Sequence, residues 1–188
     1  MDIRPGQNRG WIEVVTGTMF GGKSTELLRR LERALIANQD VVAFSKDARY
    51  EKGAITTHTE QSLTGHYVES AEDVDRLLSE NRTVEVVGID EVQFFDTDLV
   101  EVCRSWALAG KRIICAGLDQ DFRKEPFETT LGLMAEAEYV SKMLAICTRC
   151  GNPALRNHLK VESSSRIVEG SGDLYEALCR QCYEIINE

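Results

Sequence analysis

The sequence predicts an α/β fold in which helices cover a largely parallel β-sheet. Apolar runs of strand length alternate along the chain with amphipathic stretches of helical periodicity, which is typical of such sheets. A glycine-rich segment joins the first apolar run to the first amphipathic stretch. Two pairs of cysteines follow where the alternation ends, and they indicate a small metal-bound unit after the sheet. The length of 188 residues fits one domain with such an appendage.

The first half of the chain supplies two strands and two helices of this pattern. Residues 11–15 (WIEVV) form a short apolar run, which predicts a buried strand. Residues 24–38 carry leucines at helical spacing, and residues 41–45 (VVAFS) are again apolar enough for a strand. Residues 46–66 are polar and contain two glycines, so we expect a loop there. Residues 71–80 predict a short helix.

The second half continues the alternation. Residues 84–89 (VEVVGI) and 112–117 (RIICAG) are predicted strands, and the amphipathic residues 98–109 between them predict a helix, which a glycine directly follows. Residues 119–130 carry polar and aromatic side chains without a period. Residues 139–147 are apolar enough for a fifth strand. Because the alternation stops there, we expect the boundary of the main domain near residue 147.

Composition and charge restrict the functional classes. The formal net charge is −9 at pH 7 and no basic block stands out, so we do not expect a nucleic-acid-binding surface. The polar N-terminal residues lack the apolar core of a signal peptide, and no apolar run approaches the roughly 20 residues that a membrane span needs. We therefore expect a cytoplasmic protein without a membrane partner.

A phosphate-binding motif occupies the glycine-rich segment. Residues 17–24 (GTMFGGKS) match the P-loop pattern G-x-x-x-x-G-K-[ST], between an expected strand and an expected helix. Glycines let the backbone turn tightly and bring N–H groups against phosphate oxygens, while the following helix presents its positive N-terminal end. The Lys23 ammonium can reach the terminal phosphates, and the Ser24 hydroxyl can ligate Mg²⁺. The expected nucleotide-binding residues are Gly17, Thr18, Met19, Phe20, Gly21, Gly22, Lys23, Ser24 and Thr25.

Two carboxylates follow the predicted strand 84–89. In an open α/β sheet, the residues after such a strand emerge at the carboxyl edge, where the P-loop also lies. Asp90 can therefore hold Mg²⁺ through water, and Glu91 is placed to take a proton from an attacking nucleophile. The two sites together indicate ATP-dependent phosphoryl transfer. They leave open whether the acceptor is water or a substrate hydroxyl.

Two cysteine pairs form a candidate metal site. Cys147 and Cys150 are separated by two residues, as are Cys179 and Cys182, and 28 residues lie between the pairs. Each pair can supply two thiolates from one tight turn, and four thiolates suit a tetrahedral zinc ion. Because nothing suggests an open coordination position, we interpret this zinc as structural. The two remaining cysteines are expected in the core: Cys103 and Cys115.

The segment between the cysteine pairs is predicted to form a lid over a small ligand. It is rich in Ser and Gly and lacks the apolar content to pack alone, so zinc at its base lowers the entropy cost of ordering it. The alternative is a nucleic-acid-dependent ATPase of the RecA-like kind, with a zinc ribbon that grips single strands. Such ribbons usually carry clustered Lys and Arg, whereas acidic residues outnumber basic ones here.

These motifs together resemble the zinc-containing thymidine kinases, a family shared by many bacteria, poxviruses and the animal cytosol. The similarity covers roughly residues 10 to 184, in order, and comprises GTMFGGKST (17–25), KDARY (46–50), DEVQFF (90–95), GLDQDFRKEPF (117–127), CTRC (147–150) and the tail from Tyr175 to CRQCY (179–183). The resemblance implies a RecA-like P-loop core over residues 1–146. It also implies a zinc-binding domain over residues 147–188, with a lasso loop that covers the substrate.

The resemblance implies transfer of the ATP γ-phosphate to the 5′-hydroxyl of thymidine. In this hypothesis Glu91 removes the proton of the hydroxyl as it attacks. Asp90 and Ser24 hold Mg²⁺, and Lys23 with the loop amides stabilises the developing charge. Gln93 belongs to the same motif as Glu91 and is expected at the nucleotide site. The implied partners are thymidine and ATP.

The family's base pocket maps onto apolar and aromatic residues from several segments. In this interpretation Phe122 stacks on the pyrimidine ring, and the 5-methyl group is surrounded by apolar side chains. Lid residues contribute mainly backbone groups, and two charged residues of KDARY assist phosphate or magnesium placement. The expected substrate-binding residues are Met19, Asp47, Arg49, Leu118, Phe122, Phe127, Ile167, Val168 and Tyr175.

One position departs from the family pattern. Where the family often has Thr or Ser after the first arginine of the lid, this chain has Asn157, whose amide can still donate and accept hydrogen bonds. The family also implies a homotetramer and feedback by thymidine triphosphate, and we take both as expectations from the resemblance alone.

Overall fold

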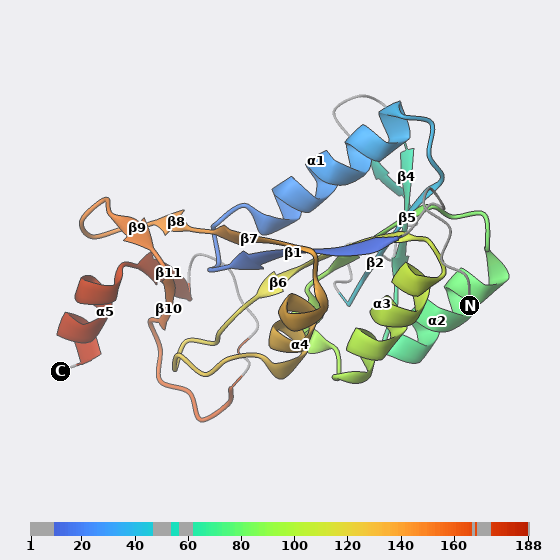
Figure 1. Cartoon of the computed structure of the whole chain (residues 1–188). Helices are drawn as coiled ribbons and strands as arrows, with labels where there is room; N and C mark the ends of the chain where they lie inside the picture. Colours follow the sequence, from blue (N-terminus) through green and yellow to red (C-terminus); the bar gives the residue numbers. More distant parts are fainter. Residues whose placement is uncertain (1–9, 47–53, 57–61, 167, 169–173, 188) are drawn as a thin grey trace.

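The main body of the protein is a seven-stranded sheet. The computed structural model describes residues 10–46, 54–56, 62–166, 168 and 174–187. The strand order is β3-β4-β2-β5-β6-β1-β7, and all strands except β3 run parallel (Figure 1). The bounds are β1 (Trp11–Gly17), β2 (Val41–Ser45), β3 (Ala54–Thr56), β4 (Ser62–Tyr67), β5 (Val86–Asp90), β6 (Arg112–Leu118) and β7 (Tyr139–Met143). The predicted α/β fold with a largely parallel sheet is confirmed.

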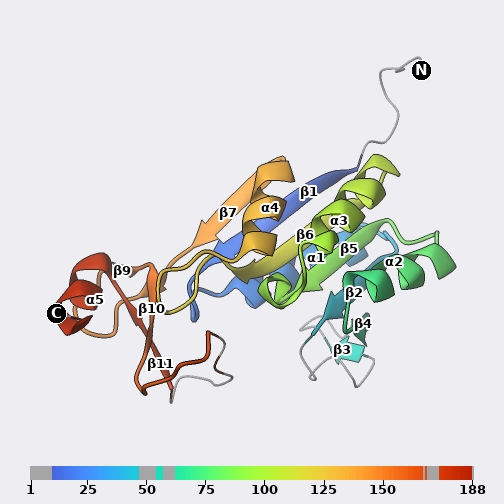
Figure 2. The same ribbon diagram turned by 90° about the horizontal axis from the view of Figure 1, so that it is seen from below.

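Helices cover both faces of this sheet. Helix α1 (Lys23–Ile36) packs on one face through Leu27, Leu31 and Ala34. Figure 2 looks onto the opposite face, which carries α2 (Ala71–Glu80), α3 (Asp98–Leu108) and α4 (Glu128–Glu136). The strands β1, β2, β5 and β6 are therefore buried on both faces, which accounts for their continuous apolar runs in the sequence, whereas the edge strand β7 is largely exposed. Among the helices of the described part of the chain, none has the length and hydropathy to cross a bilayer.

The strand order determines which residues meet at the carboxyl edge. Strand β6 lies between β1, which leads into the P-loop, and β5, which ends in Asp90. The register pairs Gly17 at the end of β1 with Leu118 at the end of β6, so both loops leave the sheet at the same level. This edge faces the second, smaller unit of the molecule (Figure 1).

The smaller unit consists of two short hairpins and a helix. Strand β8 (Ala145–Ile146) pairs with β9 (Pro153–Ala154), and β10 (Arg156–Leu159) pairs with β11 (Tyr175–Leu178), both antiparallel. Helix α5 (Arg180–Asn187) follows. The unit has its own buried cluster, which includes Ala145, Cys147, Ala154, Ala177, Leu178, Cys179 and Tyr183. The division of the chain at residue 147 stays a prediction, since β8 precedes it but pairs with β9 beyond it.

Three elements differ from the sequence prediction. The expected loop 46–66 contains β3 and β4, because β4 gains a ladder of backbone hydrogen bonds beside β2 although its sequence is polar. Helix α4 was not predicted: Leu131 is 44% exposed while Leu133 is fully buried, so its apolar residues do not follow one helical face. The expected strand 139–147 is divided into β7 and β8, which belong to different sheets.

Candidate active site and metal centre

The P-loop forms a concave backbone turn between β1 and α1. Gly17, Phe20 and Gly22 all have positive φ, at 127°, 62° and 81°. Helix α1 begins directly after Gly22, and no side chain caps its N-terminus. The first amides of the helix therefore lack a side-chain acceptor, and the helix dipole favours an anion at this point. The arrangement suits the phosphates of a nucleotide.

Lys23 is held close to the acidic residues of the neighbouring strands. Its Nζ donates to the carbonyl oxygen of Thr18 at 2.8 Å. Burial lowers the pKa of Lys23, and the negative charges of Glu91, Asp90 and Asp119 counteract this shift. The ammonium therefore lies in a partly buried place where carboxylates from β5 and β6 converge on the P-loop.

Alanine at Gly17 is expected to destabilise the protein strongly. A Cβ there would lie 1.9 Å from the carbonyl oxygen of Met143 on β7, and the φ of +127° is strained for an L-residue. At Gly22 a Cβ meets no atom within 4 Å, so Gly22→Ala destabilises the protein only through the backbone strain of alanine at a φ of +81°. We expect the free energy of unfolding to fall by about 3 kcal/mol or more for Gly17→Ala and by about 1 kcal/mol for Gly22→Ala. Denaturant unfolding measures the free energy of unfolding of both variants. Equal decreases would show that the contact between Gly17 and Met143 does not restrict residue 17.

Asp90 and Glu91 lie where β5 ends. The Asp90 side chain is buried, and its Oδ1 accepts a hydrogen bond from the backbone N–H of Glu91 at 2.9 Å. Glu91 has a φ of 55° and a ψ of 42°, a left-handed conformation that is uncommon outside glycine. Strain of this kind clusters at functional sites.

Gln93 fixes the Glu91 carboxylate. Its Nε2 donates to Glu91 Oε2 at 2.6 Å, and its Oε1 accepts from the backbone N–H of Leu118 at 3.0 Å. Gln93 lies in the short 3₁₀ helix η2 (Val92–Phe94) and is buried. The side chain thus connects the candidate base to the end of β6. Its predicted contact with the nucleotide stays a prediction.

The described residues of the predicted base pocket come from three segments. Phe122 and Phe127 lie in the loop between β6 and α4, directly after Leu118. The hydroxyl of Tyr175 on β11 donates to the carbonyl of Val168 at 2.8 Å, so a residue of the lid is held at the end of the hairpin. Three predicted substrate residues lie outside the described part of the chain: Asp47, Arg49 and Ile167.

Asn157 joins the small unit to the P-loop. Its Oδ1 accepts from the backbone N–H of Met19 at 2.9 Å, and its Nδ2 donates to the carbonyl of Gln120 at 3.0 Å. Gln120 Nε2 in turn donates to the carbonyl of Leu155 at 2.6 Å. Asn157 is 2% exposed, so these bonds are shielded from water. Three separate segments therefore meet around this one amide.

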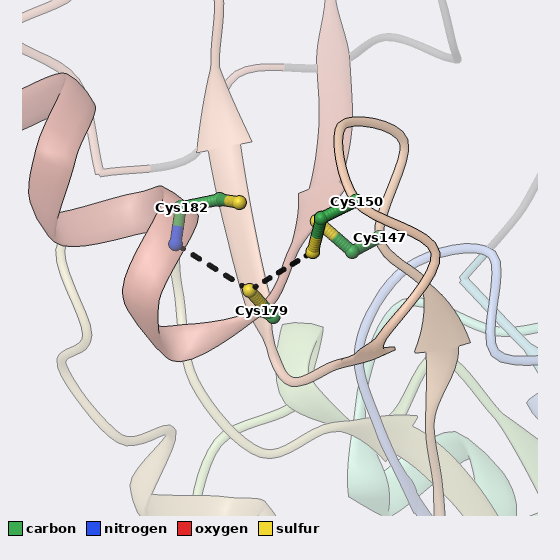
Figure 3. Close-up of side chains that lie close together, drawn as sticks. All are labelled: Cys147, Cys150, Cys179 and Cys182. Carbon is green, nitrogen blue, oxygen red and sulfur yellow. Dashed lines mark hydrogen bonds between the residues drawn. The ribbon is translucent and has the colours of Figure 1, made fainter.

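The four predicted zinc ligands converge in the small unit. The sulfur atoms of Cys147, Cys150, Cys179 and Cys182 all lie within 4.8 Å of one another, contributed by the β8–β9 turn and by the start of α5 (Figure 3). Tetrahedral zinc with bonds of about 2.3 Å places its sulfur ligands about 3.8 Å apart, so the cluster fits that ion. The Cys150 and Cys179 sulfurs are 3.5 Å apart.

Two of these thiols have strongly shifted pKa values. Burial opposes ionisation of Cys147, but backbone hydrogen bonds lower the pKa of its thiol to about 6. Hydrogen bonds with Cys150 and Cys179 raise the pKa of Cys182 to about 12. Four adjacent thiolates would repel one another, and a bound zinc ion would compensate their charge.

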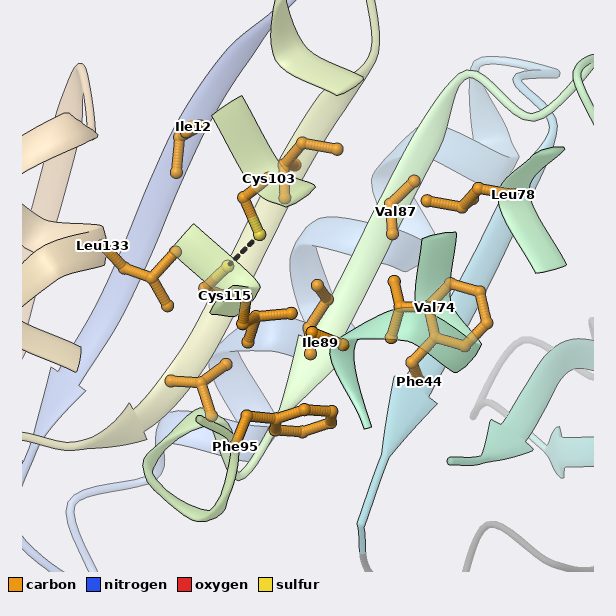
Figure 4. Close-up of a cluster of buried hydrophobic side chains, with 14 of the residues drawn as sticks. Ile12, Phe44, Val74, Leu78, Val87, Ile89, Phe95, Cys103, Cys115 and Leu133 are labelled. Atoms are coloured by element: carbon orange, nitrogen blue, oxygen red, sulfur yellow. Dashed lines mark hydrogen bonds between the residues drawn. The ribbon is translucent and has the colours of Figure 1, made fainter. Parts of the chain in front are cut away.

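The other two cysteines are core residues, as predicted. Cys103 on α3 and Cys115 on β6 are both buried, and their sulfurs lie 3.9 Å apart in the main core (Figure 4). Leu133 and Ile12 belong to the same core cluster.

Comparison with known proteins decides the family. A family model for thymidine kinase matches residues 10–183. The chain belongs to the thymidine kinase family. Curated relatives named Thymidine kinase include a protein of Rhodothermus sp. (strain ITI 518), 46% identical over 97% of this chain and 85% of the relative. A Halobacterium salinarum relative is 45% identical over 96% of this chain and 97% of its own length. A Bacteroides fragilis relative is 42% identical, with 97% and 91% covered.

Some residues at this thymidine kinase site were not among the predicted ones. Asp119 is buried beside Lys142 on β7, with 2.6 Å between Asp119 Oδ2 and Lys142 Nζ. Its negative charge acts to raise the pKa of Lys23, against the effect of burial. Asp121 lies in the loop that carries Phe122 and is also buried. Both aspartates stand in the GLDQDF motif, which was a signal that could have pointed to them. For Asn157 the sequence offered only its departure from the family pattern.

Proposed function

We propose that the protein is a thymidine kinase that transfers the γ-phosphate of ATP to the 5′-hydroxyl of thymidine. One observation carries this proposal: the P-loop and Glu91 share the carboxyl edge of the sheet with Leu118, and Gln93 links Glu91 to Leu118. A phosphate cradle, a fixed carboxylate and a loop that carries the two phenylalanines Phe122 and Phe127 therefore lie next to one another. Membership of the thymidine kinase family supports the same reaction.

In this proposal each residue has a distinct task. Glu91 accepts the proton of the 5′-hydroxyl, and Lys23 stabilises the charge that develops on the transferred phosphoryl group. Asp90, buried at the end of β5, and Ser24, in the first turn of α1, are an oxygen donor pair suited to Mg²⁺. Bound there, Mg²⁺ would neutralise phosphate charge.

The base site is proposed along the loop after β6 and the lid. Phe122 stacks on the pyrimidine, and apolar groups of Met19, Leu118 and Tyr175 surround its 5-methyl group. One methyl group in an apolar pocket contributes about 1–3 kcal/mol of discrimination, so rejection of deoxyuridine is expected to be partial. Asp47, Arg49 and Ile167 belong to this proposal on the resemblance alone.

Zinc is proposed to be structural, held by the four cysteines. Their cluster joins the β8–β9 turn to α5 and thereby fixes the base of the hairpin β10–β11. We also propose a homotetramer, the assembly that the resemblance implies. The outer edge of β7 ends the sheet in the described part of the chain, and Tyr139 on it is 62% exposed, which supports association there.

The nucleic-acid-dependent ATPase is not favoured, since the net charge is −9 and the family is that of thymidine kinases. Incubation with ATP, Mg²⁺ and either thymidine or single-stranded DNA separates the two functions. We expect ADP to form only with thymidine, in an amount equal to the thymidine monophosphate produced. ADP formation that depends on DNA and proceeds without thymidine would overturn the proposal.

A further inference from the structure

The guanidinium of Arg166 contacts the loop after β6 in several ways. Arg166 Nε donates to Asp121 Oδ2 at 2.9 Å, and its Nη2 donates to the carbonyl of Pro126 at 2.7 Å. Its guanidinium carbon also lies 4.9 Å from the centroid of the Phe127 ring. The side chain therefore combines an ion pair, a backbone hydrogen bond and a cation–π contact on one loop.

Asp121 is the fixed partner of this pair. Its side chain is 2% exposed, and its Oδ1 already accepts hydrogen bonds from the backbone N–H groups of Arg123 and Glu125, each at 2.9 Å. A buried carboxylate is costly unless hydrogen bonds and a countercharge compensate it, and Arg166 supplies that charge. Because the loop fixes the position of Asp121, the ion pair forms only where residues 163–166 place Arg166 beside it.

A second arginine, Arg123 on the loop after β6, donates to residues 163–166 from the other side of this contact. Arg123 Nη2 donates to the carbonyls of Ser163 and Ser164, both at 3.0 Å, and its guanidinium carbon lies 5.1 Å from the centroid of the Phe122 ring. The two arginines thus lie over the two phenylalanines of the proposed base pocket. The position of residues 163–166 is therefore coupled to the positions of both rings.

We propose that Arg166 is a positioning residue for the nucleoside, which holds residues 163–166 on the loop and fixes the Phe127 ring through its pair with Asp121. This inference rests on the proposed function, because that function makes the loop a base pocket. The Arg166 side chain is 44% exposed, so dissolved salt screens its attraction to Asp121. The affinity for thymidine therefore falls as ionic strength rises, by more than any effect of salt on the affinity for ATP.

Steady-state kinetics of Arg166→Met test the proposal. Methionine removes the charge and keeps an apolar stem of similar length. We expect the KM for thymidine to rise about tenfold, while kcat and the KM for ATP stay within about twofold of wild type. Between about 0.05 M and about 0.5 M salt, the thymidine KM of the wild type rises more steeply than that of Arg166→Met. The ATP KM changes equally in both.

Arg104→Met is the matched control. Arg104 on α3 is 42% exposed and pairs with Glu136 of α4 at 2.8 Å, so it has the same kind of exposed ion pair outside the proposed site and the metal cluster. Its thymidine KM and salt dependence are expected to match those of the wild type. Asp121→Asn keeps an acceptor for the two backbone N–H groups and removes the charge. In that background, Arg166→Met is expected to have a much smaller effect, which shows that the two side chains act as a pair.

Three results would overturn the proposal. They are a thymidine KM of Arg166→Met equal to that of the Arg104→Met control, a salt dependence of that KM equal to the wild type's, or an equal rise in the KM of both substrates. If Arg166→Met loses zinc or melts early, Arg166→Lys decides, since it keeps the charge but loses the planar contacts. Its thymidine KM is then expected to rise about threefold with an unchanged ATP KM, and no rise refutes the role. A wild type inactive on thymidine contradicts the proposed function before any variant is made.

Discussion

Glu91→Gln is expected to lower kcat about 10²–10⁴-fold while ATP binding remains intact. The carboxylate is held at 2.6 Å by Gln93 and lies close enough to Lys23 to affect its pKa. Glutamine has the same size, but its amide cannot take a proton from the attacking hydroxyl. Turnover of thymidine and calorimetric binding of a non-hydrolysable ATP analogue measure the two effects separately.

Glu72→Gln is a suitable control for this substitution. Glu72 is an exposed residue in the first turn of α2, which packs on the face of the sheet opposite α1. Its kcat is expected to equal that of the wild type. Near-normal turnover of Glu91→Gln would assign the proton transfer to another group. A loss of ATP affinity as large as the loss of turnover would make Glu91 a nucleotide-binding residue instead.

Cys147→Ser is expected to release zinc and to raise the KM for thymidine by at least about tenfold, with a smaller effect on ATP. Cys147 belongs to the buried cluster of the small unit, and a metal held by the four cysteines would join this turn to α5. Without it, the hairpin that carries Asn157 and Tyr175 loses its fixed base, whereas the P-loop keeps its own support from β1 and α1. Zinc content by atomic spectroscopy and KM values for both substrates test this.

Cys103→Ala provides the comparison, because Cys103 is also buried but belongs to the main core. It is expected to retain zinc and both KM values, with a moderate loss of stability. A zinc-free Cys147→Ser protein with unchanged thymidine KM would separate the metal from the nucleoside site. Equal loss of both affinities, together with loss of cooperative melting, would indicate general unfolding.

The motifs could be predicted because their chemistry is local. The P-loop needs a strand, a glycine-rich turn and a helix within some twenty consecutive residues, and the backbone of Gly17 and Gly22 follows that requirement. The spacing of the two cysteine pairs likewise predicts a four-cysteine cluster whatever the surrounding fold, and the four sulfurs do converge. Glu91 could be assigned because a buried strand must end at the edge where the P-loop lies.

The contacts between distant segments could not be predicted. Asn157 bonds to Met19, 138 positions away, and Arg166 pairs with Asp121 across 45 positions, and no periodicity records either contact. Strand β4 was missed for the same reason, since its stability comes from pairing with β2 rather than from its own composition. The residues proposed to carry the chemistry could therefore be located from the sequence, whereas the contacts that join the two units could not.

A crystal structure with thymidine and a non-hydrolysable ATP analogue tests the central claim most directly. The account predicts the 5′-oxygen of thymidine within about 2.6–3.2 Å of the Glu91 carboxylate, in line with the γ-phosphate on the P-loop. The base is expected against Phe122, beneath a hairpin fixed by zinc. A nucleoside bound elsewhere, with another carboxylate or histidine at hydrogen-bond distance from its 5′-oxygen, would contradict it.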